Sequence, residues 1–364
     1  MKAKPTLLLQ LGLGRVGRAL VAQYLAHGDR YPALRYLGVG DSSGLWLIPD
    51  GWDAPALAEA ADFKGSGMPL TRWHPDSTRA ETVPAPDAYA PDLLWRLDEL
   101  GVRRAIVVDA TPPGSDTTPL LIELHRAGYD VVLANRAPLG GSQRDYDALT
   151  KAGKGRVRAN AALGAALPLA DALRHQSGGD PIQTVIAALD PALNWILAAV
   201  QAGLRFSAAV GEAGRRGLLH RDWCEDLSGA TSARVALLLA RLGGLKGEPE
   251  AVCREALLPL GWETQAAGAV WERLGEYDSA LAQQAWLAGE QGQVLRYLAV
   301  AGPDRVRAGL EGMPATGPFG RLAAENSLVA LYRAGDARPT LLGGPSATAA
   351  TTAAAVFADV VSLL

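Results

Sequence analysis

The chain contains few cysteines, few lysines and no long apolar run. Its two cysteines, Cys224 and Cys253, are too few for a disulfide framework, and their separation matches no common zinc-binding spacing. No stretch reaches the roughly 18 to 20 uninterrupted apolar residues that a membrane span needs. The formal net charge is -3, with no polybasic block that would mark a surface for nucleic acid or anionic membrane. We therefore expect a cytoplasmic protein that binds a small-molecule substrate, with no nucleic-acid or membrane partner and no metal-binding residues.

What is present is the composition of a globular protein. The 364 residues are 49% hydrophobic and 20% charged, which is enough for about two or three hydrophobic cores. From Thr6 to about Asn135, short apolar runs alternate with helical stretches, which predicts an α/β domain with a parallel sheet covered by helices. Residues 49–86 are interpreted as an excursion on the sheet edge. The expected strands are Thr6–Leu11, Leu34–Val39, Ala105–Asp109 and Val131–Ala134, and the expected helices are Arg15–Ala26, Pro91–Leu100 and Thr118–Ala127.

After Arg156 the pattern changes to that of an α+β domain. The last 19 residues, Ser346–Leu364, form a predicted helix whose apolar face is expected to pack back on the first domain. The predicted boundaries are therefore 1–150, 151–338 and 339–364. The expected strands of the second domain are Val185–Leu189, Val294–Val300, Arg305–Leu310 and Ser327–Tyr332, and its expected helices are Pro168–His175, Asn194–Ala202, Ser207–Arg216 and one from Gly229 to Leu242.

A glycine fingerprint for a dinucleotide follows the first predicted strand and opens a helix. In Gly12-Leu13-Gly14-Arg15-Val16-Gly17, the first glycine permits a tight turn, the second lets the backbone approach a pyrophosphate, and the third allows close packing of helix on strand. The helix N-terminus adds unpaired N–H groups and a favourable dipole. We predict that Gly12, Gly14, Arg15, Val16 and Gly17 bind a dinucleotide; a glycine-rich turn without a ligand is the alternative.

Polar residues follow three further predicted strands. Asp41 stands where a carboxylate can accept hydrogen bonds from both ribose hydroxyls, which favours NAD over NADP because a carboxylate would repel a 2′-phosphate. Alternatively, Asp41 is a turn residue in the stretch 41–44. Thr111 and Asn135 follow the third and fourth strands, at the carboxyl edge where such sheets bind ligands. We predict that all three contact the cofactor, NAD, with NADP possible.

Taken in order, several short motifs resemble the homoserine dehydrogenase family over nearly the whole chain. They are Gly12–Gly17, Val107–Thr111, Ala134–Arg136, Leu163–Pro168, Asn194–Leu197, Glu212–Ala213 with Gly217, Asp226–Gly229, Val294–Tyr297, Pro318–Phe319, Asn326 and the tail helix. Members of that family interconvert aspartate semialdehyde and homoserine with a nicotinamide cofactor. The resemblance implies a Rossmann-like cofactor domain, a substrate and dimerisation domain, a C-terminal helix that returns to the first domain, and a homodimer. It also implies that Gly344 approaches the cofactor.

The chain departs from the family where the chemistry is expected. Thr231 and Val235 replace the family's aspartate and lysine on the helix after the Asp-x-x-Gly turn. His220 replaces a glutamate that holds the substrate ammonium, and Arg136 replaces a lysine. The family's Gly-Thr pair and a glutamate beside metal-binding carbonyls become Pro191-Ala192 and Asn160.

These replacements affect proton transfer. A positioned general acid contributes about 10² to 10⁴ in rate, and Val235 cannot donate a proton. Arg136 can clamp a carboxylate but is a poor proton donor, whereas His220 titrates near neutral pH. We predict Arg136, His220 and Asp226 as catalytic. The alternative is that residues 220–225 form a solvated loop and that Asp226 or Ser228 caps the next helix.

The remaining substrate contacts are predicted at Asp222 and Thr231, because Asp222 matches a carboxylate that the family retains near the substrate. Three functions stay open: an oxidoreductase acting on a small aldehyde or alcohol derived from an amino acid, a nucleotide-binding homologue without turnover, and a structural dimer whose glycine fingerprint is a relic. We expect homoserine turnover to be absent or very weak.

Overall fold

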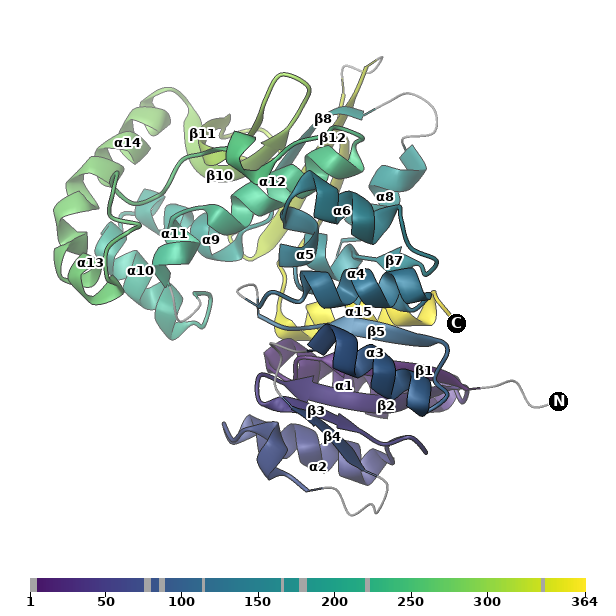
Figure 1. The fold of residues 1–364 in the computed structure, drawn as a ribbon. Helices are drawn as coiled ribbons and strands as arrows, with labels where there is room; N and C mark the ends of the chain where they lie inside the picture. Colours follow the sequence, from purple (N-terminus) through teal and green to yellow (C-terminus); the bar gives the residue numbers. More distant parts are fainter. Residues whose placement is uncertain are drawn as a thin grey trace. The chain divides into compact units, whose positions relative to one another are not determined.

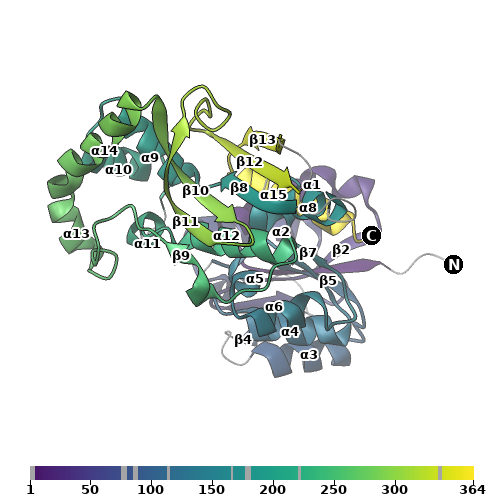
Figure 2. The same cartoon turned by 90° about the horizontal axis from the view of Figure 1, so that it is seen from above.

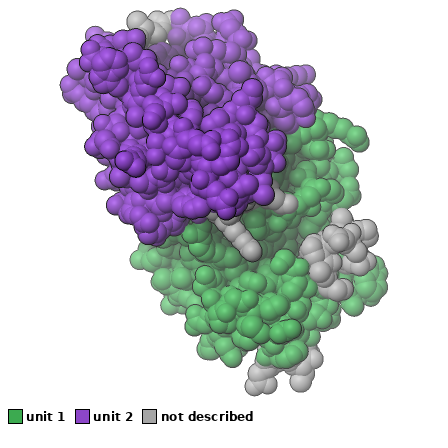
Figure 3. All heavy atoms as spheres, turned by 90° about the vertical axis from the view of Figure 1, so that its left-hand side faces the viewer, with its two compact units in different colours: residues 1–170, 348–364 green, residues 171–347 purple. Residues whose placement is uncertain are grey.

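The computed structural model describes residues 5–74, 80–84, 89–112, 115–164, 167–176, 182–219, 223–334 and 338–364. The chain forms two compact units, Met1–Ala170 with Thr348–Leu364, and Asp171–Ala347 (Figure 3). The chain passes from the first unit to the second within α8 (Leu169–Gln176).

The first unit is built on a seven-stranded sheet in the order β4-β3-β2-β1-β5-β6-β7. The strands β2, β1, β5, β6 and β7 are parallel, and β3 and β4 extend the sheet antiparallel. The strand order reverses between β1 and β5, which is where doubly wound sheets bind ligands at their carboxyl ends. The strands are β1 (Thr6–Leu11), β2 (Leu34–Asp41), β3 (Gly44–Leu47), β4 (Glu81–Pro84), β5 (Ala105–Asp109), β6 (Asp130–Leu133) and β7 (Val157–Arg158).

Several helices of the first unit, among them α1, α2 and α15, bury apolar residues in one core with this sheet. The C-terminal helix α15 packs on α1 and α7, and Figure 1 shows it directly above α1. Thr348 and Thr351 form a reciprocal capping box at its start. The helices are α1 (Arg15–His27), η1 (Gly28–Arg30), α2 (Ala54–Gly65), η2 (Leu70–Arg72), α3 (Tyr89–Glu99), α4 (Thr118–Ala127), α5 (Ala137–Gly140), α6 (Gln143–Thr150), α7 (Asn160–Leu163) and α15 (Ala349–Val361). The core they share includes Leu8, Leu20, Val21, Val39, Ile106, Val108, Val132, Val356 and Val360.

The second unit has a six-stranded sheet in the order β13-β12-β8-β10-β11-β9. Its pairs are antiparallel except for the short parallel pair of β9 with β11. Helix α12 lies against β10 and β11 (Figure 2). The strands are β8 (Ile182–Ala188), β9 (Cys253–Arg254), β10 (Gln293–Ala301), β11 (Val306–Pro314), β12 (Asn326–Arg333) and β13 (Thr340–Pro345). The helices are α9 (Pro191–Gln201), α10 (Phe206–Arg215), α11 (Trp223–Leu227), α12 (Ala230–Leu242), η4 (Pro249–Ala251), α13 (Ala267–Arg273), η5 (Leu274–Tyr277) and α14 (Asp278–Glu290).

The predicted fold class is confirmed: an α/β unit with a parallel sheet, an α+β unit, and a C-terminal helix that returns to the first. The boundaries differ from the predicted ones. The first unit continues past residue 150 to Ala170 because β7 pairs with β6 and extends its sheet. The second continues past residue 338 to Ala347 because β13 pairs with β12. In the described part of the chain, every helix is too short or too polar to span a bilayer.

Candidate functional site

The glycine turn between β1 and α1 has the geometry that the fingerprint predicts. Gly12 has φ +95, and a Cβ there would lie 2.5 Å from the carbonyl carbon of Ala110. A Cβ at Gly17 would lie 2.1 Å from the carbonyl oxygen of Gly12, so helix and turn pack without space for a methyl group. Gly14 is exposed, and a Cβ there would meet nothing within 4 Å. The turn is therefore closed by Gly12 and Gly17 and open at Gly14.

The start of α1 is suited to an anion. Gly14 is its N-cap and supplies no side-chain acceptor, and the first turn holds no acidic residue. The first N–H groups of a helix have no acceptor within the helix, so those at this end face outward with the positive end of the helix dipole. Arg15 is exposed and Val16 half-buried in this turn. A pyrophosphate group fits this arrangement.

A buried glutamine side chain forms hydrogen bonds to the backbone of the glycine turn. Gln10 is 0% exposed, and its amide nitrogen donates to the carbonyl oxygens of Gly12 at 2.9 Å and Gly17 at 3.1 Å. The hydroxyl of Tyr36 donates to its amide oxygen at 2.7 Å. Burial raises the pKa of Tyr36, so the phenol stays a donor. Gln10 is not among the predicted site residues, although it is the one polar residue in the apolar run Leu7–Leu11 before Gly12.

Asp41 ends β2 at the predicted position, but its carboxylate is engaged within the protein. It accepts hydrogen bonds from the backbone nitrogens of Ser43 at 2.8 Å and Leu70 at 3.0 Å, and it forms a salt bridge with Lys64 of α2. Burial alone would raise the pKa of Asp41, but hydrogen bonds from Lys64, Ser43 and Leu70 outweigh it and lower the pKa. A ribose hydroxyl would have to displace one of these donors.

At the carboxyl edge of β5 and β6, the predicted residues Thr111 and Asn135 lie together. The Asn135 amide nitrogen donates to the hydroxyl of Thr111 at 3.1 Å, and its amide oxygen accepts from the backbone nitrogen of Ala137 at 2.9 Å. Both side chains also donate to Asp109, a fully buried carboxylate at the end of β5 that the sequence analysis did not single out.

Arg136 and Asn160 make contacts within the first unit. Arg136 Nε donates to the carbonyl oxygen of Ala162 at 2.6 Å. Asn160 donates from its backbone nitrogen and its amide to the buried carboxylate of Asp359, at 3.0 and 2.8 Å. At the position of the family's glutamate, this chain therefore has a contact between α7 and the C-terminal helix. Among the described residues, no group of three or more His, Cys, Asp or Glu side chains is placed to hold a metal ion.

In the second unit, Asp226 is buried in α11, Thr231 is half-buried in the first turn of α12, and Val235 is 2% exposed one turn later. Gly229, between the two helices, has φ +73 and packs so closely on Tyr297 that a Cβ would lie 1.8 Å from its hydroxyl oxygen. The predicted residues His220 and Asp222 lie outside the described residues.

The start of α9 carries a buried polar pair. Asp190 caps α9 by accepting from the backbone nitrogen of Leu193 at 3.0 Å, and it also accepts from the Ser232 hydroxyl of α12 at 3.1 Å. One turn into α9, Asn194 is 3% exposed, and both polar atoms of its amide have no hydrogen-bond partner among the described residues. Gly344 lies in β13, opposite Ser327.

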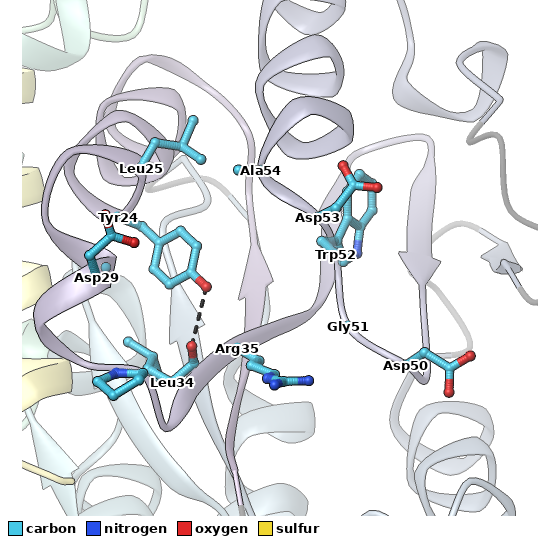
Figure 4. Close-up of a pocket in the computed structure, with 12 residues that line it drawn as sticks. Tyr24, Leu25, Asp29, Leu34, Arg35, Asp50, Gly51, Trp52, Asp53 and Ala54 are labelled. Atoms are coloured by element: carbon cyan, nitrogen blue, oxygen red, sulfur yellow. Dashed lines mark hydrogen bonds between the residues drawn. The ribbon is translucent and has the colours of Figure 1, made fainter.

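The first unit also contains an open groove of about 450 Å³, shown in Figure 4. It lies between the end of α1 and the start of β2, at the opposite end of the sheet from the glycine turn. The hydroxyl of Tyr24 donates across it to the carbonyl oxygen of Leu34 at 3.2 Å. Its charged lining residues are Asp29, Arg35, Asp50 and Asp53. None of the predicted site residues lines this groove.

The family model described as homoserine dehydrogenase matches residues 168–361. The chain is 29% identical over 243 residues to bifunctional aspartokinase/homoserine dehydrogenase 2 of Escherichia coli (strain K12), covering 64% of this chain and 30% of that protein. The chain spans between 30% and 42% of the length of the first bifunctional relatives that it matches.

Two solved structures share the fold over almost the whole chain. A protein of unknown function from Candida auris superposes with a TM-score of 0.83 at 23% identity, covering 99% of this chain and 98% of that one. A hyperthermophilic archaeal homoserine dehydrogenase in complex with NADPH superposes with a TM-score of 0.75 at 19% identity, covering 99% and 97%.

Proposed function

The chain belongs to the homoserine dehydrogenase family, and we propose that it is an NAD(P)-dependent oxidoreductase acting on a small aldehyde or alcohol derived from an amino acid. The observation that carries this proposal is the glycine turn at the switch point of the parallel sheet. The turn is open at Gly14, and the buried Gln10 side chain donates a hydrogen bond to it. The helix that follows begins without a side-chain cap. These features fit a dinucleotide pyrophosphate.

The nicotinamide ring, when bound, supplies or accepts the hydride. The protein's part is to hold the nucleotide and to move the proton of the substrate hydroxyl. Val235 stands at the position of the family's lysine, is 2% exposed and cannot exchange a proton. Loss of a positioned general acid costs about 10² to 10⁴ in rate. Homoserine turnover is therefore expected to be absent or very weak.

The predicted side chains then have separate roles. The Arg136 guanidinium is assigned to hold a carboxylate, because it cannot give up a proton near neutral pH. Asp226 and His220 are assigned to proton transfer, and Asp222 and Thr231 to substrate contact. Gly344 is assigned to the approach to the cofactor. These six assignments rest on the family resemblance and remain predictions.

Both forms of the cofactor are expected to bind. A carboxylate at the end of β2 normally repels a 2′-phosphate, but the ammonium of Lys64 lies against Asp41 and offsets its charge. The archaeal relative of the same fold was solved with NADPH. In Lys64→Met, the offset is lost, so the ratio of the NADPH to the NADH dissociation constant should rise. Arg72→Met, on the nearby η2, is the control for a general loss of positive charge.

The test of the proposed function has two stages. Titration of NADH and NADPH against the fluorescence of the nine tryptophans measures cofactor binding, and absence of binding by both would refute the proposal. Oxidation of L-homoserine, followed by a panel of small hydroxy and amino acids, is then assayed from pH 7 to 10. A homoserine turnover number of about 1 to 10³ per second, the usual enzyme range, would contradict the argument from Val235.

A second candidate is a nucleotide-binding protein without turnover, which the buried Val235 favours. Cofactor binding with no reduction by any substrate of the panel would support it. The double variant Thr231→Asp with Val235→Lys separates the cases further. We expect no rescue of homoserine turnover, because Pro191 and Ala192 also depart from the family. Strong rescue would show that the rest of the pocket is intact.

We also propose that the chain is a cytoplasmic homodimer. The dimer rests on the family resemblance and the cytoplasmic location on the scarcity of cysteine. Light scattering coupled to size-exclusion chromatography tests the dimer. A monomeric mass at micromolar concentration would contradict it.

A further inference from the structure

Asp109 is a buried carboxylate whose hydrogen-bond partners, among the described residues, are neutral donors. It ends β5 and is 0% exposed. Its Oδ1 accepts from the backbone nitrogen of Thr111 at 3.0 Å and from the Thr111 hydroxyl at 2.6 Å. Its Oδ2 accepts from the Thr117 hydroxyl at 2.7 Å and from the Asn135 amide at 3.3 Å. A buried carboxylate is costly unless its oxygens are satisfied, and these four bonds satisfy both.

The four donors come from two loops at the carboxyl edge of the sheet. Thr111 and Thr117 flank the connection from β5 to α4, so Asp109 ties both ends of that loop. Thr117 is the N-cap residue of α4, yet its side chain makes no capping bond. Its hydroxyl donates to Asp109 instead, although a threonine cap is typically worth about 1 kcal/mol. Asn135 lies in the connection after β6, so its bond links that connection to Asp109 as well.

Ala110 and Thr111, at the start of this connection, lie against the glycine turn. A Cβ at Gly12 would lie 2.5 Å from both the carbonyl carbon and oxygen of Ala110 and 2.7 Å from the nitrogen of Thr111. The position of residues 110 and 111 therefore sets the space beside the pyrophosphate turn. The Thr111 hydroxyl, which donates to Asp109 and accepts from Asn135, keeps acceptor capacity toward a ligand.

We propose that Asp109 is a positioning residue for the dinucleotide, acting through Thr111, with Asn135 as its second support. This assignment rests on the proposed function. It also changes the role predicted for Asn135, because the nitrogen of its amide donates to Asp109 and Thr111 and the oxygen accepts from the backbone of Ala137. In this arrangement Thr111 meets the nucleotide, and Asp109 and Asn135 hold Thr111 in place.

The test uses the dissociation constant of NADPH in four variants. Asp109→Asn keeps the shape of the side chain but replaces one of its two acceptor oxygens with an NH2 group, which then faces other donors. Thr111→Val removes the presented hydroxyl, and the third variant combines both changes. Thr117→Val is the matched control, because it also breaks a bond to Asp109 but touches neither Thr111 nor Asn135. Thermal midpoints are measured for each without ligand.

Asp109→Asn and Thr111→Val should each weaken NADPH binding by about three- to tenfold, because the bond lost is one neutral hydrogen bond from an N–H or O–H group of the nucleotide to the Thr111 hydroxyl. The dissociation constant of the double variant should exceed that of the weaker-binding single variant by no more than about twofold, since both changes remove the same contact. Thr117→Val should lower the thermal midpoint but change the dissociation constant by less than about threefold.

Equal losses of affinity in Asp109→Asn and Thr117→Val would show that Asp109 only stabilises the fold, and additive losses in the double variant would show that it does not act through Thr111. Either result overturns the assignment alone. Absence of NADPH and NADH binding by the unmodified protein would overturn the proposed function as well. If Asp109→Asn fails to fold, Asn135→Leu is compared with Thr111→Val in the same way, because it leaves Asp109 in place.

Discussion

Substitution of alanine at two glycines of the same turn should separate cofactor binding from folding. Gly14→Ala places a methyl group in open space, because nothing lies within 4 Å of a Cβ there. Gly17→Ala places one 2.1 Å from the carbonyl oxygen of Gly12 and 2.7 Å from the amide nitrogen of Gln10. The first change affects a bound anion and the second affects the protein itself.

The magnitudes follow from these contacts. At Gly14, alanine is a poorer N-cap than glycine by about 0.5 to 1 kcal/mol, but it also removes about 0.4 to 1 kcal/mol of unfolded-state entropy. The free energy of unfolding should therefore hardly change. At Gly17, the backbone oxygen cannot move aside, so overpacking should cost about 1 to 3 kcal/mol. In a unit of this size, that lowers the thermal midpoint by about 2 to 12 °C.

Cofactor affinity should move independently of stability in one variant. The methyl group at Gly14 pushes the pyrophosphate away from the first N–H groups of α1, and loss of one charge-assisted hydrogen bond of about 1.5 to 3 kcal/mol weakens binding about 10- to 100-fold. Fluorescence titration with NADPH and differential scanning fluorimetry without ligand measure the two quantities. Unchanged NADPH affinity in a stable Gly14→Ala variant would refute the placement of the pyrophosphate at this turn.

Three further changes test other parts of the structure. Asp130→Asn breaks the pair with Arg156, which is half-exposed, so it should cost about 1 to 2 kcal/mol at pH 7. Burial alone would raise the pKa of Asp130, but hydrogen bonds from Arg156 outweigh it and lower the pKa. The stabilisation is therefore present above about pH 4 and lost as pH falls through the folded pKa. Equal urea midpoints of the unmodified protein and Asp130→Asn at pH 7 would contradict this. Arg296→Met removes donors to the carbonyl oxygens of Leu295, Phe319, Gly320 and Leu322 and should cost about 2 to 4 kcal/mol; a loss below about 1 kcal/mol in urea unfolding would mean that those carbonyls find other donors. Asn194→Leu should raise the free energy of unfolding by about 1 to 2 kcal/mol, because it removes a buried amide that has no hydrogen-bond partner in the described part of the chain. A decrease would show that water or a ligand satisfies Asn194.

Much of the secondary structure could be predicted because its signals are local. The strands Thr6–Leu11 and Ala105–Asp109 and the helix Thr118–Ala127 occur with the predicted bounds. Their apolar periodicity repeats over short distances, and Gly128, with φ +103, ends α4 in the left-handed conformation.

The elements that were missed depend on their neighbours. The strands β3 and β4 have four residues each, too few for a clear pattern, and they form by pairing along the edge of β2. Residues 340–345 alternate between half-buried and exposed and contain two glycines, and no strand is predicted there. Pairing with β12 makes them an edge strand of the second unit.

The amino-acid sequence by itself determined the glycine turn, the two-part architecture and the family, because the turn and the elements depend on local patterns and the family on the order of short motifs along the chain. The tertiary structure alone decided which polar side chains are engaged within the protein. Asp41 meets Leu70 across 29 positions, Asn135 meets Asp109 across 26, and Gln10 meets Tyr36 across 26. A hydrogen bond between groups so distant in the chain exists only once the strands have paired, since the register of the sheet sets which side chains meet.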